Sequence, residues 1–558
     1  MSDISLISPY GGSLIDLLAP QEEVGAMRQE AVYLPSITLS TRSMLDLELL
    51  AVGAFSPLTT FMGKSDYESV RDHMRLRNGT CFPMPITLPI DNWGNVKEGQ
   101  YVVLKSPTNE YIARLFIQEI FAWDWKKEAR EVFGTTNLDH PVVREMKSWG
   151  RVCISGQLQV LYLPPRYDFP SLYGTPKKVR MRLKQFGKSK VIAFQTRNPL
   201  HRGHEKMIAE VLQMGTVLLH PVTGMTNAHD IDAIARIHSY QWMDDHVFDH
   251  RRVLLQLIPL AMRMAGPREA VWHAIIRRNY GASHLIVGRD HASPGPGYYA
   301  PFAAQKLAIS YAPQTGVTIV PFDEIVYVPK RRHFVQKRML SQGDRFLRIS
   351  ATKIRRLTRF SSWAIRPQIA RIVQAKRRKL RKGYCLWFTG LPSSGKSTIA
   401  NLLATMLHYY GYQVVRLDGD AIRQADSHAL GFSKADRDRQ VLRVGRMAKK
   451  IVNGGRIAIC SLVSPYEATR QKVRDSIGRE RFIEIYIATP IRICEKRDTK
   501  LLFLRSRAGL IKQLTGIDDP YEVPRRPTLR LFTTQTSLEK NISIILAYLK
   551  KRDFFSEA

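Results

Sequence analysis

Two histidines, His201 and His204, follow a short apolar run, Val191–Phe194, across the polar segment Gln195–Pro199. The proline predicts that a helix begins just after this segment. A spacing of three residues then places both imidazoles on one face of the first helical turn, where free N–H groups and the helix dipole attract phosphate. Arg197 adds a planar guanidinium that suits sulfate or phosphate oxygens. These side chains are predicted to hold a triphosphate and to stabilise charge that develops on phosphorus or pyrophosphate.

Two other interpretations of the histidine pair remain open. A His-x-x-His spacing supplies only two metal ligands, and no nearby cysteine or carboxylate completes an obvious zinc set. The two residues are also compatible with a structural role in capping the helix.

A second candidate site is the glycine-rich turn Gly390–Thr398, which matches the pattern G-x-x-x-x-G-K-[ST]. It follows the apolar run Tyr384–Thr389 and precedes the helical pattern Ile399–Tyr409, as a phosphate-binding P-loop does. Backbone N–H groups would surround phosphates, Lys396 would reach the β- and γ-phosphates, and Ser397 would ligate Mg²⁺. The residues predicted to bind ATP here are Gly390, Ser393, Ser394, Gly395, Lys396, Ser397 and Thr398.

The elements that must position these two sites are strands that alternate with helices. Apolar runs at Val191–Phe194 and Thr216–Leu219 enclose a helical pattern at Glu205–Met214, which predicts parallel α/β units. The pattern begins again at Tyr384, with a second strand at Gln413–Leu417. Earlier in the chain, short β-rich runs such as Cys81–Ile90 and Tyr101–Leu104 alternate with turns and predict a mostly β or α+β domain.

Breaks in composition divide the chain. A turn-rich stretch lies around residues 163–176, a Pro/Gly loop at 292–297 and a basic run at 376–382. The basic run is compatible with a nucleic-acid or import signal, but we interpret it as a solvated helix end and linker. The predicted domains are 1–170, 171–375 and 383–558, and the linker 376–382 joins the second to the third.

Composition limits the class of protein. The 558 residues correspond to about three to five domains, and the 84 basic and 49 acidic residues give a net charge of +35. This charge attracts nucleic acid, nucleotides, sulfate and pyrophosphate alike, although no aromatic–basic RNA-binding motif is visible and nucleic acid is not the expected partner. Five scattered cysteines indicate neither disulfides nor a structural metal. No membrane span or secretory signal is expected, which favours the cytoplasm.

Specific segments resemble known families. His201–His204 resembles the H-x-G-H signature of nucleotidylyltransferases, and the longer Gln195–His201 resembles that of ATP sulfurylase. Over residues 25–356, further similar segments are Gly53–Leu58, Met262–Ala270, Gly288–Ala292 and Ile349–Arg355. After residue 383 the chain resembles adenosine 5′-phosphosulfate (APS) kinase in the segments Leu417–Arg423, Leu430–Ser433, Asp436–Arg437, Ser464–Tyr466, Cys494–Asp498 and Thr515–Glu522.

The first resemblance implies a β-rich PUA-like domain, then a Rossmann-like nucleotidylyltransferase domain with a small α/β extension, and adenylyl transfer from ATP to sulfate with release of pyrophosphate. Thr196, Arg197 and Asn198 would position the reacting groups, and His201 and His204 would stabilise the transition state. Sulfate would be bound by Gln195 and Arg197 with the backbone of Ala292. The nucleotide would be lined by Gly288, Arg289, Asp290 and His291, with Val326 near adenine. Two departures, Ser293 and Ala351, change only loop freedom.

The second resemblance implies transfer of the γ-phosphate of ATP to the 3′-hydroxyl of APS, which gives 3′-phosphoadenosine 5′-phosphosulfate (PAPS). Mg²⁺ would bind with ATP at Ser397 and Asp420, and Asp420 is also a candidate for activating the hydroxyl. The expected APS site comprises Asp418, Asp420, Arg423, Phe432, Arg437, Gln440 and Lys500. Ser464 matches a serine that is phosphorylated in some family members, or has a structural role.

The kinase segments also depart from the family pattern. Ala421 and Gln440 stand where the family has asparagine, and Arg439 where it has glutamate, while Thr499 and Leu501 stand where it has proline and glycine. ATP binding is therefore expected to persist and APS affinity to be weakened. Three alternatives remain: a sulfurylase that runs towards ATP, a kinase domain that only binds nucleotide as in some fungal relatives, and a basic nucleic-acid-binding protein. The family is generally homo-oligomeric.

Overall fold

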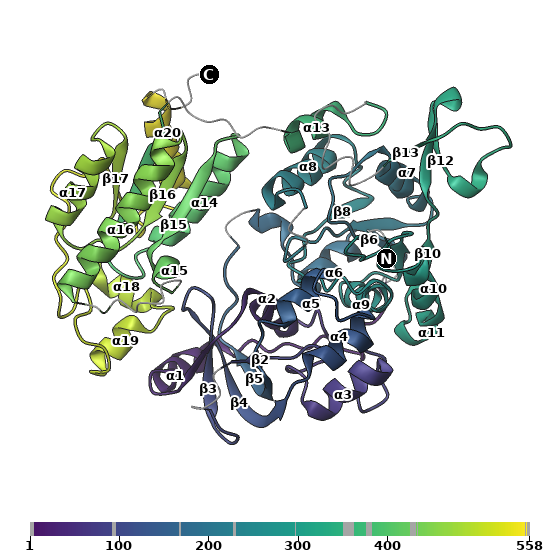
Figure 1. Ribbon diagram of the computed structural model, residues 1–558, viewed down its shortest axis with the longest axis horizontal. Helices are drawn as coiled ribbons and strands as arrows, with labels where there is room; N and C mark the ends of the chain where they lie inside the picture. The colour runs from purple at the N-terminus through teal and green to yellow at the C-terminus, as the bar shows by residue number, and fades with distance from the viewer. Residues whose placement is uncertain are drawn as a thin grey trace.

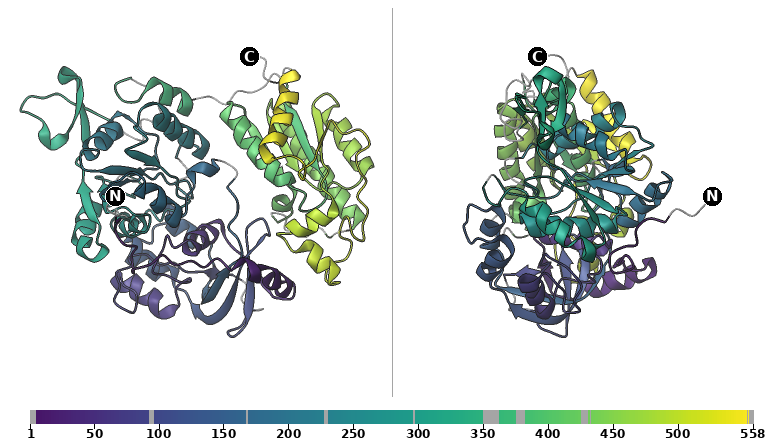
Figure 2. Two further views of the ribbon diagram at one scale, coloured as in Figure 1. Left: turned by 180° about the vertical axis from the view of Figure 1, so that it is seen from behind. Right: turned by 90° about the vertical axis from the view of Figure 1, so that its right-hand side faces the viewer.

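The computed structural model describes residues 5–91, 96–166, 169–226, 230–295, 297–349, 362–374, 382–424, 431, 433–552 and 554. We refer to residues 5–166, 169–374 and 382–554 as the N-terminal, central and C-terminal domains. The N-terminal and central domains pack together, and the C-terminal domain lies to one side of both (Figure 1); Figure 2 shows this arrangement from behind. Among the helices that the structure describes, none has the length and apolar character to cross a membrane.

The N-terminal domain is built on a five-stranded sheet with the order β1-β3-β4-β5-β2. β1 and β3 are parallel and the other pairs are antiparallel. The strands are β1 (Ser36–Thr38), β2 (Pro89–Ile90), β3 (Tyr101–Lys105), β4 (Tyr111–Ala122) and β5 (Val152–Val160), and the helices are α1 (Gln21–Ala31), α2 (Thr41–Ala51), α3 (Lys64–His73), α4 (Trp125–Phe133) and α5 (Pro141–Met146).

The central domain holds a fully parallel sheet in the order β10-β9-β6-β7-β8. Its strands are β6 (Val191–Phe194), β7 (Thr216–Leu219), β8 (Val253–Leu255), β9 (His284–Val287) and β10 (Thr318–Pro321). Its helices are α6 (Pro176–Lys184), α7 (Arg202–Val211), α8 (Ala233–His246), α9 (Gly266–Asn279), α10 (Ala303–Ser310), α11 (Ala312–Thr315) and α13 (Pro367–Gln374). A small antiparallel sheet of β11 (Ile325–Val328), β12 (His333–Gln336) and β13 (Leu347–Arg348) extends this domain.

The C-terminal domain repeats the parallel pattern, in the strand order β15-β16-β14-β17-β18. The strands are β14 (Tyr384–Thr389), β15 (Val414–Asp418), β16 (Ile457–Ser461), β17 (Phe482–Ile487) and β18 (Leu529–Leu531). The helices are α14 (Lys396–Tyr409), α15 (Gly419–Gln424), α16 (Lys434–Asn453), α17 (Glu467–Ile477), α18 (Ile491–Arg497), α19 (Leu502–Arg507) and α20 (Leu538–Lys551).

The buried cores follow the same division. One cluster of buried apolar side chains runs from Leu47 and Phe55 of the N-terminal domain to Val191 and Trp272 of the central domain. The C-terminal sheet instead has a separate core on each face. The first two domains are therefore continuous in their packing, whereas the third has an interior of its own.

The predicted architecture of a β-rich domain followed by two parallel α/β domains is confirmed. The strands expected at Val191–Phe194, Thr216–Leu219 and Tyr384–Thr389 are present as predicted. The β-rich run Cys81–Ile90 is mostly loop, and only Pro89–Ile90 pairs in the sheet. Its prolines, which lack a backbone donor, explain this difference. The linker prediction falls on residues that the structure does not describe, apart from Lys382.

Candidate functional site

The first candidate site lies where two neighbouring strands end. β6 and β9 are parallel neighbours in the central sheet, so the segments that follow them, Gln195–Asn198 and Gly288–Ser293, meet at one edge. Arg197 joins the two, because its Nη2 donates to the Ser293 carbonyl oxygen at 2.8 Å. Carboxyl ends of strands in open parallel sheets are the usual place for ligands. The segments that sequence reasoning assigned to sulfate and nucleotide therefore lie side by side.

The turn after β6 is held from several sides. Thr196 Oγ1 accepts the N–H of Asn198 at 3.1 Å, and Tyr240 of α8 donates to the Asn198 carbonyl at 2.8 Å. Arg236, also on α8, donates to the Arg197 carbonyl at 2.8 Å. The Arg197 side chain is only 15% exposed, and its Nη1 lies 3.7 Å from Asp230 Oδ2. These contacts fix the backbone from which the ligand-facing side chains project.

The two histidines form a reciprocal cap at the start of α7. His201 is the N-cap residue, and its Nδ1 accepts the backbone N–H of His204 at 3.3 Å. The backbone N–H of His201 points in turn to His204 Nδ1 at 3.5 Å. The rings stack with centroids 3.6 Å apart. Because both Nδ1 atoms accept, each ring carries its proton on Nε2, where it can donate to a phosphate oxygen.

Capping and phosphate binding are thus compatible functions of the same pair. Burial, with the neighbouring His204, lowers the pKa of His201 well below its ordinary value, and burial lowers the pKa of His204 to about 4. Both rings are therefore neutral near pH 7. They can stabilise developing charge as hydrogen-bond donors, and a bound phosphate would favour their protonated forms.

His291, on the second segment, begins a buried chain of polar groups. Its Nε2 lies 2.9 Å from His273 Nδ1, and His273 Nε2 lies 3.3 Å from Glu269 Oε1. Burial would raise the pKa of Glu269, but the neighbouring His273 and two backbone N–H groups lower it to about 2. Burial also lowers the pKa of His291 to about 3. An ionised carboxylate therefore lies at the end of a chain of two buried histidine rings beneath the site.

The remaining residues predicted for nucleotide are placed less tightly. Arg289 and Asp290 are 38% and 60% exposed after β9, with Arg289 Nε 3.8 Å from Asp290 Oδ1. Ala292 has a left-handed backbone with φ 54°, and its carbonyl accepts the N–H of Gly266. Val326 lies in β11 and its side chain is fully buried. Its predicted contact with adenine would have to involve a side chain that is part of the core.

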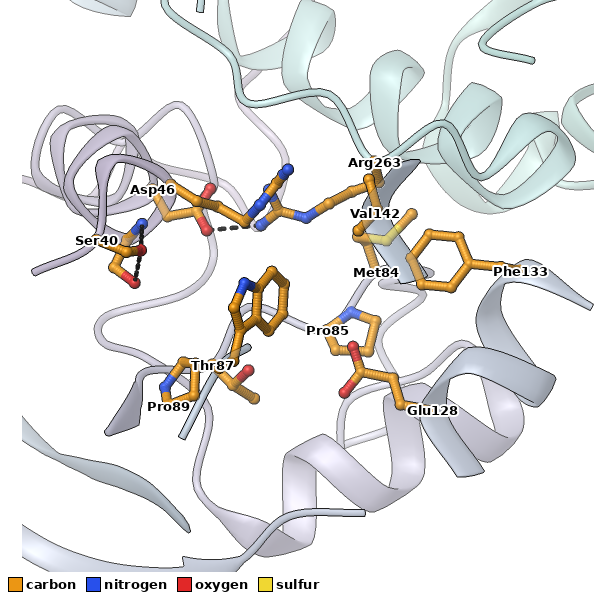
Figure 3. A pocket seen from close by; sticks show the side chains of 13 residues that line it. Ser40, Asp46, Met84, Pro85, Thr87, Pro89, Glu128, Phe133, Val142 and Arg263 are labelled. Carbon is orange, nitrogen blue, oxygen red and sulfur yellow. Dashed lines mark hydrogen bonds and ion pairs between the residues drawn. The ribbon is translucent and has the colours of Figure 1, made fainter. Parts of the chain in front are cut away.

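A small cavity lies between the N-terminal and central domains and is lined in part by Arg263, which precedes Met264 in the chain. Its labelled residues include Asp46 and Arg263, joined by a hydrogen bond of 2.6 Å (Figure 3). The cavity has a volume of about 20 Å³, which is room for about one water molecule, so it is no substrate pocket. Arg42 donates to the Met262 carbonyl at 3.1 Å. These pairs fix the loop whose Met264 Sδ lies 2.9 Å from Arg197 Nη1.

The second candidate site is the turn between β14 and α14. Gly390 and Gly395 have φ values of 150° and 101°, and Ser393 has φ 56°, so the turn curls back on itself as a phosphate cradle requires. Lys396 Nζ donates to the Leu391 carbonyl at 2.6 Å. Burial lowers the pKa of Lys396 to about 8, and a bound phosphate would favour its protonated, charged form.

Acidic groups face this turn. Ser397 Oγ donates to Asp418 Oδ2 at 2.8 Å, and the N–H of Asp420 donates to Asp418 Oδ1 at 3.0 Å. Lys500 Nζ forms an ion pair with Asp420 Oδ2. Partial burial would raise the pKa of Asp420, but the Lys500 ammonium outweighs it and the pKa is lowered. Asp420 is therefore ionised and 54% exposed, beside the hydroxyl and carboxylate oxygens that Mg²⁺ prefers.

Some of the residues expected to bind APS also make contacts within the protein. Arg437 Nη1 donates to Thr515 Oγ1 at 2.7 Å and its Nε lies 3.7 Å from Asp519. Gln440 is 4% exposed, and its amide donates to the Gly419 carbonyl at 3.2 Å. Gln440 thus braces the turn that carries Asp420. Arg423 follows on α15, and Phe432 lies outside the described residues.

Ser464 is 3% exposed and its backbone has φ 39°. Its Oγ donates to Thr389 Oγ1 at 3.0 Å and accepts the indole N–H of Trp387 at 3.1 Å. These contacts fit the structural interpretation of this serine, since both partners lie in β14 beside the P-loop.

Several supporting residues were not found from the sequence. They are Arg236, Tyr240, Met264, Glu269 and His273. Only Met264 and Glu269 lie in a segment with family resemblance, Met262–Ala270. None of these residues forms a spacing pattern with Arg197, because packing and not sequence proximity brings them together.

Comparison with known proteins gives three family matches. A PUA-like domain matches residues 7–163, ATP-sulfurylase residues 170–376 and adenylylsulphate kinase residues 382–532. Sulfate adenylyltransferases of Mycosarcoma maydis and Chaetomium globosum are 37% and 36% identical to this chain. The matches cover 97% and 98% of this chain and 98% of each relative. A solved structure described as a hexameric APS kinase from Thiobacillus denitrificans is 29% identical, with a TM-score of 0.56 and 98% of both chains covered.

Proposed function

The chain belongs to the ATP-sulfurylase family and carries a C-terminal domain of the adenylylsulphate kinase family, and we propose that it catalyses two consecutive steps of sulfate activation. ATP and sulfate would give APS and pyrophosphate in the central domain. A second ATP would then phosphorylate APS to PAPS in the C-terminal domain. The observation that carries this proposal is the coexistence of the Arg197–His201–His204 edge with a complete P-loop.

In the first reaction Arg197 and the amide of Gln195 hold sulfate, and a sulfate oxygen attacks the α-phosphorus of ATP. The new P–O bond forms as the bond to the bridging α–β oxygen breaks, and that oxygen leaves with pyrophosphate. The buried Gln195 Oε1 has no hydrogen-bond partner among the described residues. His201 and His204 donate from Nε2 to the phosphate oxygens that gain charge. No side-chain nucleophile is needed, because orientation and electrostatics supply the rate.

In the second reaction Asp420 accepts the proton of the 3′-hydroxyl of APS as that oxygen attacks the γ-phosphorus, and the bond from the γ-phosphorus to the bridging β–γ oxygen breaks, so that this oxygen leaves with ADP. Its pairing with Lys500 favours the ionised form that can act as a base. Lys396 and the P-loop N–H groups bind the phosphates of ATP. Ser397, Asp418 and Asp420 offer the oxygen ligands that suit Mg²⁺, which would neutralise phosphate charge when bound with ATP. Arg423, Arg437 and Lys500 supply positive charge for APS.

The direction of the first reaction depends on concentrations, because the same residues bind both sides of the equilibrium. We therefore propose activation of sulfate as the forward reaction, and synthesis of ATP from APS and pyrophosphate as its reverse in a cell that supplies APS. The intact P-loop supports an active kinase over a domain that only binds nucleotide. The hexameric relative supports a homo-oligomer.

The test is one assay of the full-length chain with ATP, Mg²⁺, sulfate and inorganic pyrophosphatase, in which ATP, APS and PAPS are separated by chromatography. PAPS is expected to accumulate. APS without PAPS would show a sulfurylase whose C-terminal domain only binds nucleotide. A parallel reaction from APS and pyrophosphate measures the reverse rate, and formation of neither APS nor ATP would overturn the sulfurylase assignment.

A further inference from the structure

The segment that carries Lys500 is attached to another domain. The segment runs from the end of α18 through Asp498, Thr499, Lys500 and Leu501 into α19. Figure 1 places α19 beside α1 of the N-terminal domain. The N–H of Tyr111 donates to the Thr499 carbonyl at 2.7 Å, which adds a backbone hydrogen bond across the domain boundary.

Leu501 anchors this contact. It is 2% exposed and packs in an apolar cluster with Met27 and Ala31 of α1 and with Val103 and Tyr111 of the N-terminal sheet. Its backbone is left-handed, with φ 55°, a conformation that is costly for a residue with a branched side chain. Burial against the N-terminal domain offsets this cost, so the conformation of the turn depends on the contact.

Polar contacts flank the apolar anchor. Arg28 of α1 donates from Nη2 to the Asp498 carbonyl at 2.5 Å. The Asp498 carboxylate accepts the N–H groups of Leu502 and Phe503 at 2.9 and 2.8 Å, which caps α19. Thr499 Oγ1 lies 3.5 Å from Glu110 Oε1. Both ends of the turn are therefore fixed.

Lys500, between the two docked residues, points the other way. Thr499 and Leu501 face the N-terminal domain, and the Lys500 ammonium pairs with Asp420 at the kinase site. Burial would lower the pKa of Lys500, but Asp420 outweighs it and Glu110 contributes to the raised value. The docked residues are also the two at which this chain departs from the family's proline and glycine.

We propose that the N-terminal domain positions Lys500, through the docking of Thr499 and Leu501, so that the affinity of the kinase for APS depends on a domain that takes no part in its chemistry. This inference rests on the proposed kinase function. Arg28 and Leu501 are positioning residues, since neither contacts the phosphate cradle. If the turn were not docked, Lys500 would still be present but would no longer be held in one position.

The experiment compares Leu501→Gly and Arg28→Ala with Lys500→Ala in the full-length chain. Leu501→Gly removes the apolar anchor and relieves the left-handed strain, while Arg28→Ala loosens the same contact from the opposite domain. Leu510→Gly is the matched control, because Leu510 is 48% exposed and lies just beyond α19. Loss of a charge-assisted hydrogen bond is equivalent to about 10- to 150-fold in affinity. A loosened turn that keeps its lysine is expected to raise the KM for APS by about 3- to 10-fold on the same scale.

The expected pattern is a raised KM for APS in both docking variants, with kcat, the KM for ATP and the sulfurylase rate within twofold of the wild type. The double variant should be raised by less than the product of the two effects, because both loosen one contact. An unchanged KM for APS in Arg28→Ala and Leu501→Gly, with a raised value in Lys500→Ala, would overturn the proposal. If Leu501→Gly fails to fold, Arg28→Ala decides.

A wild type without kinase turnover would refute the proposed function and leave the docking testable. Calorimetric titration of APS into the chain with Mg²⁺ and ADP then gives the Kd directly. A Kd for APS that is raised in both docking variants and unchanged in Leu510→Gly supports positioning. Equal Kd values in the wild type, Leu501→Gly, Arg28→Ala and Leu510→Gly overturn it.

Discussion

Replacing Arg197 by alanine is expected to remove most of the adenylyl-transfer activity. The side chain connects the segments after β6 and β9, donating from Nη2 to the Ser293 carbonyl at 2.8 Å. Its other terminal nitrogen lies 2.9 Å from Met264 Sδ. The substitution therefore removes both the cation that we propose binds sulfate and the link between two segments of the site.

Removal of one such electrostatic contact costs about 10²–10³ in rate, or about 2.7–4 kcal/mol. Arg197→Lys keeps the charge, but a single ammonium cannot hold the Ser293 carbonyl and a sulfate oxygen in the fixed geometry of a guanidinium fork. It is expected to recover only part of the loss, and the loss of the second hydrogen bond should leave it at least about tenfold below the wild type.

The assay is pyrophosphate release at saturating ATP over a range of sulfate concentrations, which separates the KM for sulfate from kcat. Arg202→Ala is the matched control, since Arg202 is a nearby arginine that pairs with Glu205 at 3.4 Å, and it removes the same charge at the start of α7. Thermal unfolding checks that the fold is retained. Activity of Arg197→Ala within a few-fold of the wild type would refute the assignment.

Three further outcomes are expected. Lys396→Ala should stop conversion of supplied APS to PAPS and leave APS synthesis intact, because the γ-phosphate loses its main cation; loss of both activities with an unchanged melting curve would contradict independent sites. Ala421→Asn, at an exposed position beside Asp420, should lower the kinase KM for APS by about 2- to 13-fold; an unchanged or higher KM would refute the missing-amide explanation. The urea midpoint of unfolding should fall between pH 7 and pH 4.5, because burial lowers the pKa of His204 and His238 to about 4 and the unfolded chain binds more protons in that interval; a pH-independent midpoint would contradict these values.

Sequence reasoning succeeded where the signal is local. The runs Val191–Phe194 and Thr216–Leu219 are continuous and apolar because both faces of a parallel sheet are buried, and the structure confirms both strands. The P-loop and the His-x-x-His pair can be recognised from short spacings, and their assignment to phosphate binding stays a prediction. The β-strand prediction for Cys81–Ile90 was wrong for most of its length, because apolar composition does not show whether backbone N–H groups are available for strand pairing.

The support of the first site could not be predicted in this way. Glu269 and His273 fix His291 from α9, and Tyr240 holds Asn198 from α8. Each is an ordinary residue of an amphipathic or buried helix when considered alone. Their function follows from which helix packs beneath which strand end, a property of the whole sheet.

The effect of the departures in the kinase domain could not be predicted from the sequence either, because it depends on contacts with another domain. Compared with the family pattern, Thr499 and Leu501 are departures without an assigned effect, whereas the weaker APS site was predicted from the missing asparagine amides at positions 421 and 440. In the fold, Leu501 packs into the apolar cluster of the N-terminal domain, and Thr499 meets Glu110, which is 389 positions away in the chain. Proline at 499 would still offer its carbonyl to Tyr111, but glycine at 501 would leave the apolar cluster unfilled. A substitution that removes a family residue from one site can therefore add a contact at another, and the effect on affinity depends on how firmly that contact holds the lysine between them.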